Sequence, residues 1–168
     1  MVDLEKVPEF YRGYIKAAGN GDLVPLLLKS GDDFITFCRS LTEQQGLYKY
    51  EPDKWSIKDI ILHLIDSERV FAYRALRFAR NDKTELSGFD QNIYVPEAKA
   101  DDRTIYNMLT EFTNVRAATV DMFSSFNEGM RERTGVASGV EMSVEMLGYI
   151  ISGHLIHHMN VIQERYTK

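Results

Sequence analysis

The sequence contains a single cysteine, Cys38, which therefore cannot form an internal disulfide bond. It stands close to Phe34, Phe37 and Leu41, so a small buried thiol is favoured over a catalytic one. Long apolar stretches are also missing: nowhere do about 18 apolar residues follow one another, and the first residues show no basic run ahead of an apolar one. We therefore expect a cytoplasmic protein that spans no membrane and carries no secretion signal.

Clusters of positive charge are absent as well. The formal net charge is −5, and Lys and Arg are dispersed among Asp and Glu, as on an ordinary solvated surface. Binding to a phosphate backbone requires several Lys or Arg side chains on one face. We therefore expect no nucleic-acid partner.

Apolar residues make up 44% of the 168 residues and charged residues 27%, which is typical of one globular domain with a full hydrophobic core. No internal repeat and no linker divides the chain. The sequence therefore predicts a single domain over residues 1–168.

Apolar residues recur at helical spacing in four segments of roughly 18 to 25 residues, and no segment alternates with strand period over a useful length. The segments run from about Asp22 to Leu41, from Ser56 to about Arg80, from about Asp102 to Phe126, and from Ser143 to about Tyr166. A shorter aromatic piece, Phe10 to Ala18, precedes them and is expected to lie across the bundle. This pattern predicts an all-α fold, a four-helix bundle.

Helix starts and connections refine this prediction. Ser56 and Ser143 are expected to cap their helices, and Asp101 or Asp102 is available to cap the third. The connections 81–100 and 127–142 are too long for minimal bundle turns, which indicates long crossover loops. The first holds several apolar and aromatic residues, so we expect it to pack over another part of the protein.

All four histidines lie in the second and fourth segments: His63, His154, His157 and His158. At about 100° per residue, His154 and His158 fall within about 20° of the centre of their apolar stripe, while His157 lies to one side. A pair at i and i+4 can direct two imidazole nitrogens to one ion at about 2.0–2.1 Å. His63, at the edge of the stripe of its own segment, is the other histidine available as a third ligand.

A hydrogen-bonded core histidine is the alternative interpretation, and for His63 alone it is the more common arrangement. Two histidines on one buried stripe are harder to explain, because neutral imidazoles need partners and charged ones repel and lose solvation. Three histidine ligands leave a coordination position for water or substrate, as in catalytic zinc sites. Leu155 replaces the Glu of the HExxH motif, which excludes a peptidase of that type.

Several motifs, in their order and spacing, resemble the DinB-like superfamily and its YfiT-like branch of metal-dependent enzymes. They are the stretch from Trp55 to Arg69, the Gly88-Phe89-Asp90 loop, Arg116, and Ser143 followed by Gly153 to His158. The resemblance implies a four-helix bundle and a divalent ion, Zn²⁺ or Ni²⁺ above all, held by three histidines at positions 63, 154 and 158.

The resemblance also implies a small-molecule substrate, which in some branches is joined to a low-molecular-weight thiol such as bacillithiol, mycothiol or glutathione. It further implies a homodimer. The aromatic side chains of Phe10, Tyr11 and Tyr14, expected to be exposed on the short N-terminal piece, also favour a homodimer.

Other side chains are candidates for roles around the ion. Glu68 and Arg116 both project from apolar stripes, so we expect them to meet, either as a buried ion pair that fixes the register of the bundle or as a carboxylate that tunes a metal ligand. His157 is expected to neighbour the site or to face solvent. Three further residues are candidates for the mouth of a pocket, although surface or packing roles are more common: Asp90, Tyr94 and Arg74.

These observations predict a metal-dependent transferase or hydrolase in which the ion activates a thiol or a water molecule. No side chain stands out as a general base, which favours the thiol. One alternative is a non-catalytic, stress-related protein that binds a metal ion or a small ligand, which a fourth protein ligand closing the metal site would favour. Another is a metal-free helical interaction module.

Overall fold

The computed structural model describes residues 2–166; Met1, Thr167 and Lys168 of the predicted single domain lie outside this range. In chain order the elements are α1 (Glu9–Ala18), α2 (Leu23–Arg39), α3 (Glu43–Gly46), α4 (Ile57–Ala79), α5 (Gln91–Ala98), the 3₁₀ helix η1 (Ala100–Asp102), α6 (Ile105–Ser124), α7 (Glu128–Arg131), β1 (Thr134–Ala137), β2 (Val140–Ser143) and α8 (Val144–Arg165). The predicted helical class is confirmed.

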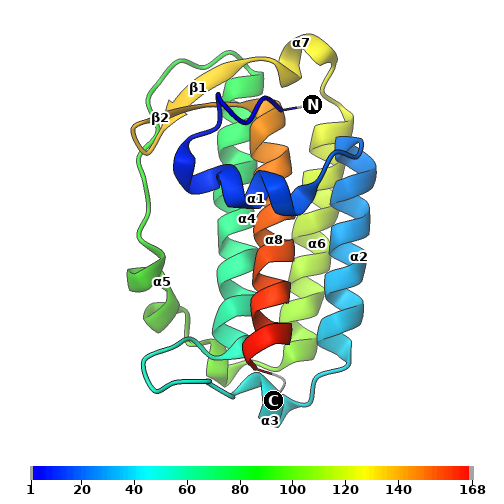
Figure 1. Cartoon of the computed structure of the whole chain (residues 1–168), viewed down its shortest axis with the longest axis vertical. Coiled ribbons are helices and arrows are strands. Elements are labelled where there is room, and N and C mark those ends of the chain that lie inside the picture. Colours follow the sequence, from blue (N-terminus) through cyan, green and yellow to red (C-terminus); the bar gives the residue numbers. More distant parts are fainter. Residues whose placement is uncertain (1, 167–168) are drawn as a thin grey trace.

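The long helices α2, α4, α6 and α8 form the bundle, and α1 crosses it (Figure 1). Helix α8 packs against α4 and α2, and α6 packs against the same two helices on the other side. The connection that carries α5 returns along the length of the bundle, so α4 and α6 run in the same direction (Figure 1). No helix formed by the described residues combines the length with the hydropathy that a bilayer span requires.

Two of the predicted helix starts are confirmed. The Ser56 Oγ accepts a hydrogen bond from the Asp59 backbone N–H at 3.0 Å, and the Ser56 N–H donates to the Asp59 carboxylate at 2.9 Å, which completes a capping box. The Ser143 Oγ accepts from the Met146 N–H at 3.0 Å. These caps place the first residues of α4 and α8, the helices that carry the histidines.

The predicted cap of the third helix is wrong. Thr104 caps α6, since its Oγ1 accepts from the Asn107 N–H at 3.1 Å. Asp101 lies in η1, where its carboxylate accepts from the Ser56 hydroxyl at 3.1 Å. Asp101 therefore helps to join the crossover to the start of α4.

The connection between α6 and α8 contains a β-hairpin that was not predicted. Strands β1 and β2 pair antiparallel, with Thr134 opposite Ser143. Ser138 and Gly139 at the turn have φ angles of 55° and 74°, as a two-residue type I′ turn requires. The strands have four residues each, too few for their alternation to stand out in the sequence.

Helix α1 lies directly on α8 because Gly153 has no side chain. A Cβ at position 153 would stand 1.8 Å from the carbonyl oxygen of Tyr14, so any other residue would push the two helices apart. The expected exposure of the aromatic side chains on α1 is correct only for Phe10. Tyr11 is buried in the core and Tyr14 is half-buried.

A buried arginine joins the four helices of the bundle. The Arg116 Nε and Nη2 donate to the two carboxylate oxygens of Glu68 at 2.9 and 2.8 Å, so the expected contact is present. The Arg116 Nη1 donates to the Leu27 carbonyl at 2.7 Å and to the Ser30 Oγ at 3.0 Å. The Ser30 hydroxyl in turn lies 3.3 Å from that of Ser152 on α8. The network fixes the positions of α2, α4, α6 and α8 relative to one another.

Substituting Gly153→Ala tests the α1–α8 contact. We expect a loss of about 1–3 kcal/mol of folding free energy, because the methyl group must displace backbone atoms of α1. Gly13→Ala is the control: it lies in the interior of α1 with no atom near its Cβ position, so it should stabilise the protein by about 0.5–1 kcal/mol. Urea denaturation measures both, and equal effects would contradict the close approach.

Glu68→Gln tests the buried ion pair. We expect a loss of about 3–5 kcal/mol, because the Arg116 charge then stays buried without its counterion. Asp33→Asn, in the exposed Lys29–Asp33 pair, should cost less than about 1 kcal/mol. A change of similar size in the two variants, measured by urea denaturation, would show that Arg116 does not depend on Glu68.

Candidate metal centre

Three histidine rings meet inside the bundle. His63 from α4 and His154 and His158 from α8 each offer one ring nitrogen, and these nitrogens lie within 4.8 Å of one another. The ring centroids are 4.6 to 5.2 Å apart, and the Nε2 atoms of His63 and His154 are separated by 3.1 Å. Two nitrogens on one tetrahedral ion would be about 3.4 Å apart. The rings therefore need only small adjustments to share an ion.

The helices explain this convergence. His154 and His158 stand one turn apart on the face of α8 that packs against α4, and His63 lies on the facing side of α4. His63 was expected at the edge of its apolar stripe; its side chain is buried, as is that of His154, while His158 is half-buried. The structure thus brings together the three histidines named as candidate ligands.

The three imidazoles are uncharged at neutral pH. Burial lowers the pKa of His63 to about 4 and that of His158 to about 3, with neighbouring histidines adding to the shift at His158. Burial, followed by the three other histidines, holds the pKa of His154 well below its usual value. A neutral imidazole keeps one nitrogen lone pair, which is what a metal ion requires of this ligand.

Hydrogen bonding within the cluster is incomplete. The Nδ1 of His158 is buried and has no hydrogen-bond partner among the described residues. The Nδ1 of His63 has a long contact, 3.4 Å, with the Ser67 hydroxyl. A buried polar atom without a partner costs about 1–3 kcal/mol. A divalent ion fits this donor set, because it would supply the partner that the His158 Nδ1 lacks among the described residues.

Aromatic rings surround the histidines. The Trp55 ring lies on His63 with centroids 4.8 Å apart, and the Tyr14 ring lies on His154 at 4.9 Å. Phe71 contacts His154 from another side at 6.1 Å. Neither Tyr14 nor Trp55 was predicted to lie at the site. Gly153 directly precedes His154 and allows α1 to approach α8 closely. This glycine was the feature of the sequence from which a contact between Tyr14 and His154 could have been predicted.

The site is open on one side. A surface cleft of about 290 Å³ reaches His158, and its wall includes Tyr50, Trp55 and Tyr166. A second hollow, beside His63 under α5, holds only about 10 Å³. A molecule of substrate size can therefore approach the histidines from the His158 side.

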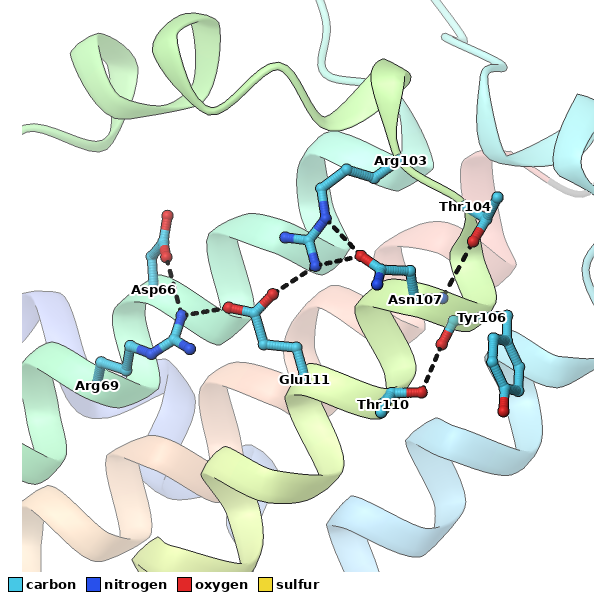
Figure 2. A network of polar contacts seen from close by, with 8 residues as sticks. All are labelled: Asp66, Arg69, Arg103, Thr104, Tyr106, Asn107, Thr110 and Glu111. Atoms are coloured by element: carbon cyan, nitrogen blue, oxygen red, sulfur yellow. Dashed lines mark hydrogen bonds and ion pairs between the residues drawn. The ribbon is translucent and has the colours of Figure 1, made fainter.

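Asp66 is a third residue near the site that was not predicted from the sequence. It borders the small hollow together with His63, one helical turn along α4. Figure 2 shows its carboxylate next to Arg69, at 3.6 Å, and Arg69 next to Glu111, which Arg103 also contacts. Burial raises the pKa of Asp66, although its cationic neighbours oppose the shift. Asp66 is thus a candidate proton acceptor near His63, and its spacing of three residues from that histidine was the signal.

The other candidate residues near the metal centre have different positions. His157 is exposed, with its ring 5.2 Å from that of His158 and 5.4 Å from that of Tyr14, and it is not part of the ligand group. The hydrogen bonds between Glu68 and Arg116 lie within the helix network described above. Among residues 2–166, no hydrogen bond joins this pair to the three histidines, which favours the structural interpretation of the pair.

Of the three residues considered for the mouth of a pocket, one borders a hollow and two lie elsewhere. Tyr94 borders the small hollow beside His63, whereas Asp90 is exposed and caps α5 by accepting from the Asn92 N–H at 2.8 Å. Arg74 has the packing role that was favoured over the pocket mouth: its side chain is buried and donates to the Ser87 carbonyl and the Ser138 Oγ, which fastens the crossover and the hairpin to α4.

Two expectations about buried and packed segments are confirmed. Burial raises the pKa of the Cys38 thiol, as expected for an inert core cysteine. The 81–100 crossover packs over α4 through α5, and Val95 of this helix is buried there. It thereby covers the His63 side of the site.

Comparisons with known proteins agree with this architecture. A model of the DinB superfamily matches residues 26–162. YfiT from Bacillus subtilis, described as a probable metal-dependent hydrolase with an unusual four-helix bundle topology, is 14% identical, with a TM-score of 0.72 over 98% of this chain and 93% of that one. A mycothiol-dependent maleylpyruvate isomerase is 10% identical, with a TM-score of 0.67 over 95% of this chain and 62% of that one. No curated protein matches the sequence significantly.

At these identities, the two solved structures show a shared fold and nothing finer. The family match spans most of the chain, from within α2 to near the end of α8, and includes all three histidines. The chain therefore belongs to the DinB superfamily.

Proposed function

We propose that this protein is a metal-dependent enzyme that binds Zn²⁺ or Ni²⁺ through His63, His154 and His158 and acts on a small molecule. One observation carries the proposal: three uncharged, largely buried imidazoles converge beside an open cleft, and one of their nitrogens has no hydrogen-bond partner within residues 2–166. The two structural relatives support it, since one is described as a probable metal-dependent hydrolase and the other as a thiol-dependent isomerase.

The protein's own residues define how the site works. When bound, the divalent ion supplies Lewis acidity, which lowers the pKa of a thiol or a water molecule beside it. Ser67 orients the His63 ring through its Nδ1, while Trp55 and Tyr14 keep water away from the backs of His63 and His154. The cleft at His158 leaves room for a substrate next to the activated group.

We favour thiol transfer over hydrolysis. A thiol loses its proton near neutral pH once its pKa is lowered, and the thiolate is then the nucleophile without help from a base. Hydrolysis needs a proton acceptor for the attacking water. Asp66 is the candidate, but Arg69 and its link to Glu111 hold its carboxylate beside the small hollow on the His63 side, away from the cleft.

A structural metal site is the less favoured alternative. Such sites are closed by four protein ligands. Among residues 2–166, the ligand group consists of three histidines, and the half-buried His158 borders the cleft. This arrangement leaves a position for substrate and therefore favours an enzyme over a stress-related binding protein. A homodimer stays a prediction, to which the exposed Phe10 ring on α1 lends some support.

Metal content tests the proposed ligands. Wild-type protein purified without a histidine tag should contain about one Zn²⁺ or Ni²⁺ per chain, and His154→Ala should lose it, because two ligands cannot hold the ion as three do. His157→Ala, which changes the adjacent exposed ring, is the matched control and should keep its metal. Elemental analysis measures all three proteins; metal-free wild type, or equal metal in His154→Ala, would disprove the site.

A panel of low-molecular-weight thiols and electrophiles tests the reaction. Turnover should disappear on chelation and return with Zn²⁺ or Ni²⁺, and it should require the thiol. Asp66→Asn separates the two chemistries: hydrolysis without its base should slow by about 10²–10⁴-fold, whereas thiol transfer should change little. Turnover that survives complete metal removal would refute the proposal, and thiol-independent turnover that Asp66→Asn abolishes would assign the hydrolase.

A further inference from the structure

The cleft that reaches His158 has an aromatic wall. Tyr50, Trp55 and Tyr166 contribute three rings, and Ile60 and Val161 add aliphatic surface. The cleft lies where the segment before α4 meets the end of α8, so its wall comes from two parts of the chain that are far apart in sequence. The half-buried side chain of His158 is also part of the lining.

Contacts within this wall hold the rings in place. Tyr166 packs edge-on against Tyr50, with centroids 4.9 Å apart and planes at 83°, and its hydroxyl donates to the Trp55 carbonyl at 2.9 Å. Arg165 lies 5.5 Å from the centre of the Tyr50 ring and donates to its hydroxyl at 3.3 Å. Trp55 is fixed on its other side by His63. A wall with fixed rings loses little conformational entropy when a flat ligand binds.

Size and charge limit the occupant. A volume of about 290 Å³ is at the lower end of the range for ligand sites. It would hold roughly ten water molecules or an organic molecule of about 10–15 non-hydrogen atoms. Asp53 and Lys54 of the lining are exposed and have opposite charges. The cleft therefore has no net charge that would favour an anionic or a cationic ligand. Asn92 of α5 adds a neutral polar group.

We propose that this cleft binds a small, uncharged, planar substrate, aromatic or conjugated, between Trp55, Tyr50 and Tyr166, with its reactive end at His158. Flat rings stack or pack edge-on against such a wall, whereas a saturated ring of equal size cannot. The inference rests on the proposed function, because it names the class of electrophile on which the metal site acts. The bulk of a larger thiol co-substrate would lie outside this cleft.

Fluorescence of Trp55 can report ligand binding, because Trp55 is the one tryptophan of the chain. The metal-free and the Zn²⁺-loaded protein are titrated with 4-nitrobenzyl alcohol, a planar neutral molecule whose nitro group quenches indole fluorescence. We expect saturable quenching with a dissociation constant of about 1 mM or below. Benzyl alcohol should displace the probe at least about threefold more effectively than cyclohexylmethanol, which has the same size but a saturated ring.

Two variants connect the binding to the cleft. Val161→Phe fills the cleft and should weaken binding at least about tenfold, and Tyr50→Leu, which removes one ring but keeps an apolar side chain, should weaken it several-fold. Val115→Phe is the matched control, since Val115 is also a partly buried valine on the same hydrophobic core but lies away from the cleft. Circular dichroism verifies that each variant folds, and Tyr50→Leu carries the test should Val161→Phe fail to fold.

The outcomes separate this inference from the proposed function. Quenching without saturation, or equal affinity in wild type, Val161→Phe and Tyr50→Leu, would overturn the cleft assignment even in a protein that binds its metal. Equal displacement by benzyl alcohol and cyclohexylmethanol would overturn the planar class. Binding of the probe to the metal-free protein does not require a metal ion at the three histidines. The titration therefore tests the ligand site in the cleft independently of the metal content.

Discussion

The buried Arg116 guanidinium is the constraint on which the bundle depends. A charged group without water must find a counterion and hydrogen-bond acceptors, and Arg116 finds them on α4 through Glu68 and on α2 through Leu27 and Ser30. A slide of α4 by one turn, about 5.4 Å, would break this arrangement. The same slide would carry His63 away from its partners on α8. The ion pair thus contributes to the proposed metal site by holding the register of the helices, without contacting one of the three histidines.

A second constraint determines the character of the site. Because Gly153 has no side chain, α1 lies directly on α8, and the Tyr14 ring contacts His154. The capping box at Ser56 fixes Trp55 just before α4, where its ring contacts His63. The two rings cover parts of His63 and His154, and the His158 side stays open to the cleft. Burial keeps the imidazoles uncharged, so the fold prepares them as ligands.

The fold of the bundle is compatible with more than one type of reaction. The same fold occurs in a protein described as a probable metal-dependent hydrolase and in a mycothiol-dependent isomerase, so the fold by itself does not define the reaction that we propose. In this chain, those residues are an aromatic cleft wall on one side and, on the other, the crossover with α5 above Asp66. Arg74 contributes indirectly, because it fastens this crossover and the hairpin to α4.

The sequence alone determined the features that depend on neighbours within about four residues: the helical class, the caps at Ser56 and Ser143, and the pairing of His154 with His158 on one face of a helix. Only the tertiary structure decided which helices lie side by side, and with them the position of the Tyr14 ring against His154. The four-residue strands and the Thr104 cap also escaped prediction, since short strands leave too little periodicity and several polar residues compete as caps. Helix caps and helical periodicity depend on residues that are close in the sequence and can therefore be predicted from it. Contacts between distant segments depend on how the whole core packs.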